Sequence, residues 1–146
     1  MIYAVIDTNV LVSALLTSNP LSATKKVLNL LSSCKVTPLI NDEVISEYID
    51  VLHRNKFPFK TEDIDNLISF IQQVGIDTTR TPFPESMPDE DDRVFFEITL
   101  TVEESFLVTG NLKHYPKQPQ VVTPAEFIEL VEKQDQGICP GYYKKS

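Results

Sequence analysis

The sequence predicts a single α/β domain in which an open parallel β-sheet lies between two layers of helices. Short apolar, β-rich segments alternate with longer segments whose apolar residues recur at helical spacing, and this alternation is typical of parallel sheets. The length of 146 residues suits one domain. A hydrophobic content of 42% and only four glycines indicate a globular protein without low-complexity tracts.

The first half of the chain predicts two strands and four helices. Residues 1–6 are apolar and β-rich, and "DTN" at residues 7–9 is expected to turn the chain into a short helix. Asn41 and Thr61 are the expected N-caps of two later helices. In order, the expected elements are a strand at 1–6, helices at 10–16 and 22–34, a strand at 35–40, and helices at 42–54 and 61–74.

The second half predicts three strands, two helices and a tail. Thr123 and Pro124 have the residue types of an N-cap and a first helical position. The expected elements are a strand at 76–80, a proline-rich loop at 81–90, a helix that starts in the acidic run 89–92, a strand at 105–111, at most a helical turn at 111–116, a strand at 120–123 and a helix at 123–133. We expect one folded domain over residues 1–134 and a C-terminal tail at 135–146, which has no periodicity.

The sequence carries no sign of secretion or of a membrane span. The apolar stretch at residues 4–16 is interrupted by Asp7 and Asn9, and no basic region precedes it. Cys34 and Cys139 lie far apart and match no metal or redox spacing, which fits a reducing compartment. We therefore expect a cytoplasmic protein that does not bind membranes.

The formal net charge of −8 argues against a large basic surface for nucleic acid. Nucleic acid remains a candidate ligand if several of the acids converge on a divalent cation, which would offset their charge. The basic residues are grouped locally, and most of these groups are explained as solvated helix faces and ends. Lys113 and His114 are expected on a loop near the site, where they could contact phosphate.

Four acidic residues stand in a row at 89–92, directly before an apolar helical pattern. Carboxylates near a helix N-terminus are stabilised by about 0.3–1 kcal/mol each. Their mutual repulsion is about 1 kcal/mol per close pair in water and several times larger where water is excluded. The run is therefore either a solvated helix start or part of a cation site. Asp92 lies on the same side of the expected helix as its apolar residues and is therefore the first candidate for such a site. Asp91 is the second candidate.

Two polar residues lie at the carboxyl ends of expected strands. Asp7 comes directly after the first strand, and Asn111 is the last residue of the strand expected at 105–111. Ligands of open parallel sheets bind outside the carboxyl ends of the strands. Asp7 therefore either caps the next helix or belongs to a ligand site.

Glu47 flanks the apolar face of the helix expected at 42–54. At about 100° per residue, the apolar residues span roughly 140°, and Glu47 lies about 60° outside that arc, with Glu43 and Asp50 further round. Glu47 is thus either a solvated surface residue or the acid of this helix that leans over the sheet edge. The apolar residues in question are Val44, Ile45, Tyr48, Ile49 and Leu52.

Four segments together resemble a known family. They are "IDTNVLVSAL", "EVISEYIDVL", "PDEDDRVFFE" and "FLVTGN", in the order and rough spacing of the PIN domain. The chain looks most like the bacterial VapC-type toxins, over nearly all of its length before the tail. The resemblance implies a small α/β fold and an Mg²⁺- or Mn²⁺-dependent ribonuclease, in which three or four acids hold the metal.

The resemblance also selects residues. It implies Asp7, Glu47 and Asp92 as metal ligands and Asn111 as the fourth catalytic position. PIN domains commonly carry aspartate at that fourth position, whereas asparagine is a neutral oxygen donor that could weaken metal binding or turnover.

Three further residues are candidates for contacts around the ligands. Asn9 and Thr109 belong to the same motifs and either orient ligands or substrate or serve as a helix cap and a strand-end hydroxyl. Lys113 is a candidate phosphate contact.

Carboxylates suit the implied chemistry. Mg²⁺ and Mn²⁺ prefer hard oxygen ligands and keep several waters. Such an ion can activate a water for attack on phosphorus and neutralise charge that develops on phosphoryl oxygens. As partners, the resemblance implies single-stranded RNA and, for a toxin, a small antitoxin protein and often a homodimer.

Two alternatives stay open. The first is a PIN-like module that binds RNA or a protein without cutting, which Asn111 favours. The second is a phosphatase with Asp7 as a phosphoaspartyl nucleophile. Against the second, haloacid-dehalogenase-type enzymes carry Asp-x-Asp where this chain has Asp7-Thr8-Asn9, and their acidic pair follows a late strand, whereas Asp91 and Asp92 precede one.

Overall fold

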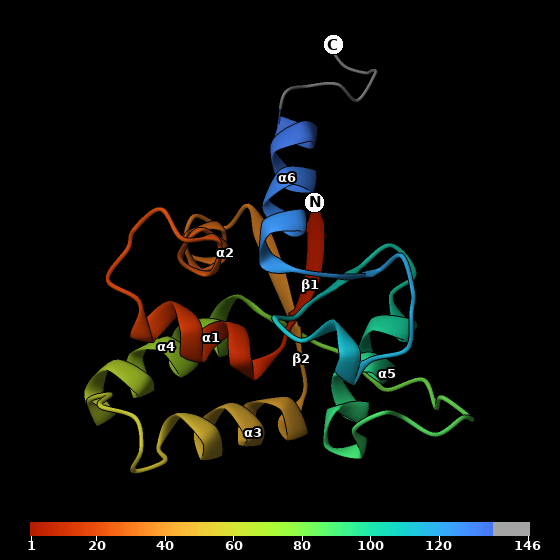
Figure 1. The fold of residues 1–146 in the computed structure, drawn as a ribbon, viewed down its shortest axis with the longest axis horizontal. Coiled ribbons are helices and arrows are strands. Elements are labelled where there is room, and N and C mark those ends of the chain that lie inside the picture. The colour runs from red at the N-terminus through yellow and green to blue at the C-terminus, as the bar shows by residue number, and fades with distance from the viewer. Residues whose placement is uncertain (136–146) are drawn as a thin grey trace.

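A computed structural model describes residues 1–135 of the chain. Apart from Asp135, the tail predicted at 135–146 lies outside the described residues. Within them, five strands form one parallel sheet in the order β3-β2-β1-β4-β5, with six α-helices around it (Figure 1). This confirms the predicted α/β architecture. The strands are β1 Ile2–Ile6, β2 Val36–Ile40, β3 Ile76–Asp77, β4 Phe106–Val108 and β5 Val121–Val122. The α-helices are α1 Thr8–Leu16, α2 Ala23–Ser32, α3 Asp42–Leu52, α4 Thr61–Val74, α5 Arg93–Thr101 and α6 Pro124–Asp135, and the 3₁₀ turns are η1 Glu90–Asp92 and η2 Leu112–His114.

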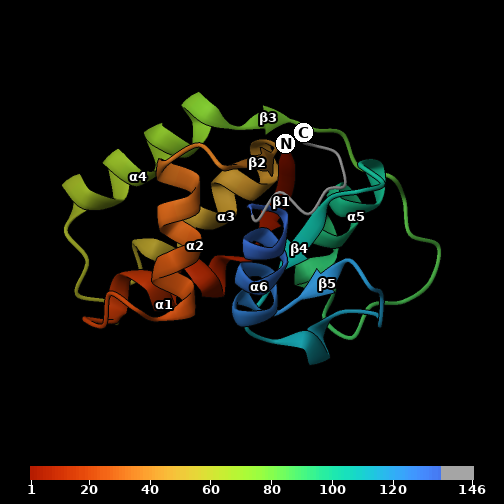
Figure 2. The ribbon, with the colours of Figure 1, turned by 90° about the horizontal axis from the view of Figure 1, so that it is seen from above.

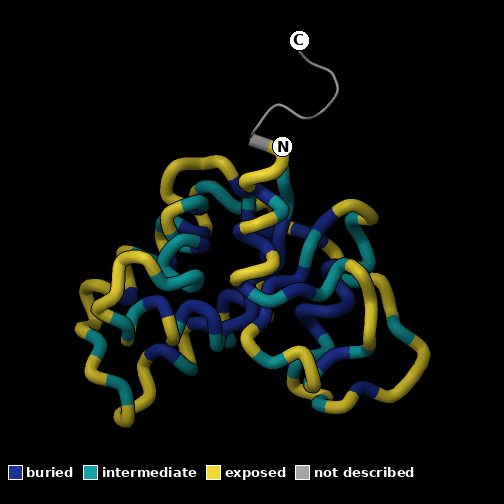
Figure 3. The backbone as a smooth tube through the Cα atoms, turned by 45° about the horizontal axis from the view of Figure 1, so that its top comes forward, coloured by how far each residue is buried: buried dark blue, intermediate teal, exposed yellow. Residues whose placement is uncertain are grey.

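Helices cover both faces of the sheet. The neighbouring helices α2 and α6 pack on β2 and β4 from one side, and α5 packs on β1, β2 and β4 from the other (Figure 2). In β1, Ala4, Val5 and Ile6 are at most 1% exposed, so the central strand is apolar on both faces. Figure 3 shows the buried chain running through the middle of the molecule, with exposed segments at its loops. No helix within residues 1–135 is long and apolar enough to cross a membrane.

The order of strands reverses between β1 and β4. The chain passes from β1 through β2 to β3 at one edge, and then continues on the other side of β1 with β4 and β5. Ligands of such sheets bind outside the carboxyl ends at the point of reversal. The register pairs Ile6 with Val108, and the Asp7 N–H donates to the Val108 carbonyl at 3.0 Å. Asp7 and Thr109 therefore leave the sheet beside each other at this point.

Several local boundaries differ from the sequence expectation, among them that of β4, which covers only residues 106–108 of the expected 105–111. Helix α1 begins at Thr8, not at residue 10, because Asp7 acts as its N-cap and the "DTN" segment enters the first helical turn. Lys60 precedes α4 without a side-chain cap bond, and Thr61 is the first helical residue. Strand β3 covers only residues 76–77 of the expected 76–80. The chain leaves the sheet after Thr78, whose N–H still donates to the carbonyl of Ile40.

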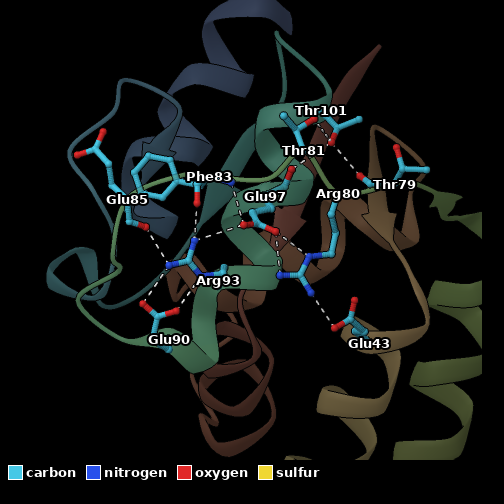
Figure 4. Close-up of polar contacts among 10 residues, drawn as sticks. All are labelled: Glu43, Thr79, Arg80, Thr81, Phe83, Glu85, Glu90, Arg93, Glu97 and Thr101. Carbon is cyan, nitrogen blue, oxygen red and sulfur yellow. Dashed lines mark hydrogen bonds and ion pairs between the residues drawn. The ribbon is translucent and has the colours of Figure 1, made fainter.

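The connection from β3 to α5 is held by a network of charged residues, which we call the arginine network: Arg80, Arg93, Glu43, Glu90 and Glu97 (Figure 4). At its centre, Glu97 is only 6% exposed and accepts from Arg80 at 2.8 and 2.9 Å and from the Phe83 N–H at 2.9 Å. Burial by itself would raise the pKa of Glu97, but these hydrogen bonds outweigh burial and lower it. Arg80 also pairs with Glu43 of α3 at 2.7 Å, so the network joins α3 to α5.

Arg93 fastens the loop to the first turn of α5. Its guanidinium donates to the carbonyls of Phe83 at 2.7 Å and Glu85 at 2.9 Å, and pairs with Glu90 at 2.7 Å. The hydrogen bond from Arg93 lowers the pKa of Glu90 to about 2. Because Asp92 lies directly before Arg93, these contacts fix the position from which Asp92 projects.

Candidate functional site

Asp7 is a buried carboxylate at the point of strand reversal. It is 4% exposed, and its Oδ2 accepts hydrogen bonds from Tyr115 Oη at 2.8 Å and Thr109 Oγ1 at 2.9 Å. Within residues 1–135, its Oδ1 accepts only the Asn9 N–H, at 3.5 Å. Burial raises the pKa of Asp7, whereas the hydrogen bonds from Tyr115, Thr109 and Asn9 act to lower it. Oδ1 therefore keeps lone pairs for a ligand, while Oδ2 is occupied.

Asn9 and Thr109 tie the two central strand ends together. Asn9 Oδ1 accepts the Gly110 N–H at 3.0 Å, and Asn9 Nδ2 donates to Thr109 Oγ1 at 3.5 Å. Thr109 Oγ1 also accepts the Asn111 N–H at 3.0 Å while it donates to Asp7. Of these two predicted candidates, Thr109 thus contacts Asp7 directly by its side chain, and Asn9 holds the segment that follows β4.

Asp92, His114 and Asn111 form a second hydrogen-bonded chain. His114 Nδ1 lies 3.0 Å from Asp92 Oδ2, and Asn111 Nδ2 lies 2.8 Å from His114 Nε2. A carboxylate oxygen accepts, so His114 Nδ1 donates the bond to Asp92 Oδ2. Asn111 therefore contacts a histidine in this structure, and through it is connected to Asp92.

The two acids lie close enough to interact. Burial, followed by the negative charge of Asp7, raises the pKa of Asp92 to about 6. His114 contacts Asp92 and the next residue, Tyr115, contacts Asp7, so one dipeptide reaches both carboxylates. Burial, followed by the charges of Asp7 and Asp92, raises the pKa of the Tyr115 hydroxyl, which therefore stays a hydrogen-bond donor. Asp92 itself lies in η1, directly before α5 and not inside that helix as the sequence predicted.

Among residues 1–135, one group of three acidic, His or Cys residues has candidate ligand atoms that all lie within 4.8 Å of one another. This group consists of Asp89, Asp92 and His114. Asp89 Oδ2 lies 3.8 Å from His114 Nδ1, and Asp89 Oδ1 accepts the Asp91 N–H at 3.0 Å. Asp89 is thus both the N-cap of η1 and a partly buried neighbour of the histidine, whereas the sequence left open whether the acidic run is a solvated helix start or part of a cation site. Asp91 is exposed.

Glu47 stands apart from this group. It is partly buried on α3, where it borders an open hollow of about 450 Å³ that is lined only by residues of that helix. Burial raises the pKa of Glu47, and the charges of Asp91 and Asp7 add to the rise, so it lies within electrostatic reach of the site. Among residues 1–135, Asp7, Glu47 and Asp92 do not form a group whose candidate ligand atoms all lie within 4.8 Å of one another. Its helix face is also narrower than predicted, because Ile49 is 42% exposed.

Sequence reasoning missed the part played by Tyr115 and placed His114 only at the rim. Tyr115 is 4% exposed and bonds to a residue 108 positions away. The one available signal is that a buried tyrosine hydroxyl generally needs a partner. Lys113 is exposed beside His114, and no contact with either acid is present.

The residues present fit a hard divalent cation. Asp7 has no cationic side chain within ion-pair distance among residues 1–135, so hydrogen bonds are the main interactions that stabilise its charge. Thr8 Oγ1, next to Asp7, is the one buried side-chain polar atom without a partner in the described part of the chain. Oxygen-rich, anionic groups of side chains are what Mg²⁺ and Mn²⁺ prefer.

The comparison with known proteins agrees with this geometry. A family model described as "PIN domain" matches residues 3–113. No match was found among the curated proteins. The matched range covers more than half of the chain and includes Asp7, Glu47, Asp92 and Asn111. With its parallel α/β fold, the chain thus belongs to the PIN domain family, whose members are generally metal-dependent nucleases.

Proposed function

We propose that this protein is an endoribonuclease that depends on Mg²⁺ or Mn²⁺ and hydrolyses phosphodiester bonds of RNA. The observation that supports this most strongly is the pairing of two carboxylates, Asp7 and Asp92, by the adjacent residues His114 and Tyr115 at the reversal of the sheet. Burial raises the pKa values of both acids, and the charge of Asp7 raises that of Asp92 further. A bound cation that neutralises both carboxylates would therefore stabilise them.

Asp7 and Asp92 would hold the cation directly, and Glu47 would contact it through water. When bound, the ion supplies a lowered pKa for an attacking water and neutralises charge on the phosphoryl oxygens. Thr109 and Tyr115 occupy Asp7 Oδ2 and so orient Oδ1 as the free oxygen. His114 occupies Asp92 Oδ2 in the same way. These hydrogen bonds preorganise the oxygens before substrate arrives.

The biological role that we propose is that of a toxin in a toxin–antitoxin pair, in the cytoplasm. The support is the resemblance to VapC-type proteins in the four segments described above. A small antitoxin protein and a second copy of the chain are the partners that this role implies.

A second candidate function is RNA or protein binding without cleavage. The contact between Asn111 and His114 favours it, because the fourth position offers a neutral amide that is already engaged. The phosphatase alternative is less compatible with the structure, because Asp7 is 4% exposed and one of its oxygens accepts two hydrogen bonds.

An RNA cleavage assay separates these functions. Single-stranded RNA oligonucleotides are incubated with the protein in Mg²⁺, Mn²⁺ or EDTA, and the products are resolved on a gel. We expect cleavage with either metal and none in EDTA, and a loss of at least about a hundredfold in Asp7→Asn and Asp92→Asn. Asp65→Asn, the same change at an exposed position on α4, should cleave normally.

Three other outcomes would overturn the proposal. Binding without cleavage by the wild type supports the binding module. Cleavage that Asp7→Asn and Asp92→Asn leave unchanged places the chemistry elsewhere. A phosphate trapped on Asp7 supports the phosphatase.

A further inference from the structure

A small hollow opens beside the candidate site, between η2 and β5. It has a volume of about 250 Å³, and its lining includes the apolar residues Leu112, Pro116 and Val121. Tyr115 also lines it, and the hydroxyl of Tyr115 donates to Asp7 at 2.8 Å. The hollow and the candidate metal site therefore share a residue, and an RNA strand bound at one would pass the other.

Two lysines line the same hollow. Lys113 and Lys117 are exposed, and neither ammonium has a carboxylate within 4.0 Å among residues 1–135. In a chain with a net charge of −8, two unneutralised cations next to an acidic site form a local positive patch. Such a patch complements the phosphate groups of a polynucleotide.

The size of the hollow limits what can enter it. Clefts for drug-sized ligands measure about 300–1,000 Å³, so a hollow of about 250 Å³ suits one flat group of the size of a base. Leu112 is 43% exposed and offers an apolar surface at this hollow. A base in a duplex is stacked and paired and cannot reach such a surface, whereas a base in a single strand can.

We propose that this hollow binds one nucleotide of single-stranded RNA next to the scissile phosphate. The base lies against Leu112 and Pro116, and Lys113 and Lys117 hold the adjoining phosphate. The proposal rests on the proposed nuclease function and adds the place at which one nucleotide of the substrate binds. It gives an acidic protein the positive contact with its substrate that the carboxylates alone do not provide.

The test measures binding separately from cleavage. The affinity of the full-length protein for a labelled single-stranded RNA is measured in EDTA at several salt concentrations. For single strands, the slope of log K against log[salt] has a magnitude of about 0.7 for each phosphate that the protein neutralises. We expect this magnitude to fall by about 1.4 in the double variant Lys113→Gln/Lys117→Gln. Leu112→Ala should weaken binding while it leaves the slope unchanged.

The matched control is the double variant Lys60→Gln/Lys133→Gln, which makes the same change in net charge at exposed positions directly before α4 and on α6. Its slope should equal that of the wild type. Single-stranded DNA and duplex RNA are measured in parallel. If single-stranded DNA binds as tightly as single-stranded RNA, the result supports a site that contacts base and phosphate. If duplex RNA binds as tightly as single-stranded RNA, the result overturns the single-strand preference.

The result can be separated from that of the cleavage assay. In one outcome, the wild type cleaves RNA, but the Lys113/Lys117 change alters the salt slope no more than the control change does. This result overturns the proposal that the hollow binds RNA and leaves the proposed nuclease function intact. A wild type that binds RNA through these lysines but never cuts it overturns the nuclease and supports the hollow. Absence of any RNA binding overturns the hollow as a substrate site.

Discussion

At the scale of single residues, His114 and Tyr115 are neighbours in the chain, yet each contacts a different acid. Backbone neighbours point their side chains in different directions, and here one direction leads to Asp92 and the other to Asp7. The distance between these two carboxylates therefore depends on a short segment that belongs to neither of their own elements. Changes in this segment should alter metal binding without removing any carboxylate.

Tyr115→Phe tests this dependence. The variant keeps the ring and removes the hydroxyl, so Asp7 loses one of its two donors to Oδ2 and its carboxylate becomes less stable. A hydrogen bond to a charged group contributes about 1.5–3 kcal/mol, and we expect Mn²⁺ affinity to fall about tenfold, measured by isothermal titration calorimetry. Tyr48→Phe is the matched control, because the Tyr48 hydroxyl donates to the Ile6 carbonyl at 2.5 Å and not to an acid. Equal affinities in wild type and Tyr115→Phe would contradict the role given to Tyr115.

Asn111→Asp tests the fourth position. The variant adds a carboxylate where PIN domains commonly have one, next to His114 and near Asp92. One extra charge at about 4 Å contributes about 1 kcal/mol even in water, so Mn²⁺ affinity should rise at least about fivefold. Asn111→Ala, which also breaks the contact with His114 but adds no charge, should show no such rise. If both variants bind Mn²⁺ equally, position 111 is not near the ion.

The sequence predicted that Asp7 and Asn111 lie at the edge of the sheet, because a polar residue at the end of a buried strand must reach that edge. It could not predict Tyr115, because a contact across 108 residues leaves no local pattern. The helical angle of Glu47 placed it beside the buried face but could not give its distance from Asp7.

At the scale of elements, the arginine network explains how the long connection before α5 is held. The sequence predicted a proline-rich loop there, but no local pattern indicates that charged residues 17 and 37 positions apart will pair, as Arg80 does with Glu97 and Glu43. Asp92 depends on this network for its position, because it lies between Glu90 and Arg93.

Glu97→Gln tests the network through stability. Removal of the charge leaves the donors of Arg80, Arg93 and Phe83 poorly satisfied, so the free energy of unfolding in urea should fall by about 1–3 kcal/mol at pH 7. The matched control is Glu129→Gln, which breaks an exposed pair with Lys133 and should cost about 0.5 kcal/mol or less.

The effect of Glu97 should also depend on pH with a defined sign. Its folded pKa is lowered, so its contribution is present above the unfolded value of about 4.3 and is lost as pH falls through the folded pKa. The difference between wild type and Glu97→Gln should therefore shrink when the urea titration is repeated at pH 3. A difference that is constant from pH 7 to pH 3 would contradict the charge as its cause.

At the scale of the whole molecule, the alternation of apolar runs and helical patterns was enough to predict a parallel sheet with helices on both faces. The order of the strands could not be predicted in this way, because short apolar strands of similar composition do not specify their neighbours. Yet this order matters for function, since the reversal between β1 and β4 brings Asp7 beside Thr109. The fold thus brings Asp7, directly after β1, within electrostatic reach of Asp92 in η1.

The most direct test of the account is a crystal structure of the protein soaked in Mn²⁺, with the ion located by anomalous scattering. We predict one peak bound by Asp7 Oδ1 and an Asp92 oxygen at about 2.1 Å, with Glu47 reaching it through water. A peak held by Asp89, Asp92 and His114 without Asp7, or the absence of any peak at Asp7, would contradict the central claim that Asp7 and Asp92 share a divalent ion.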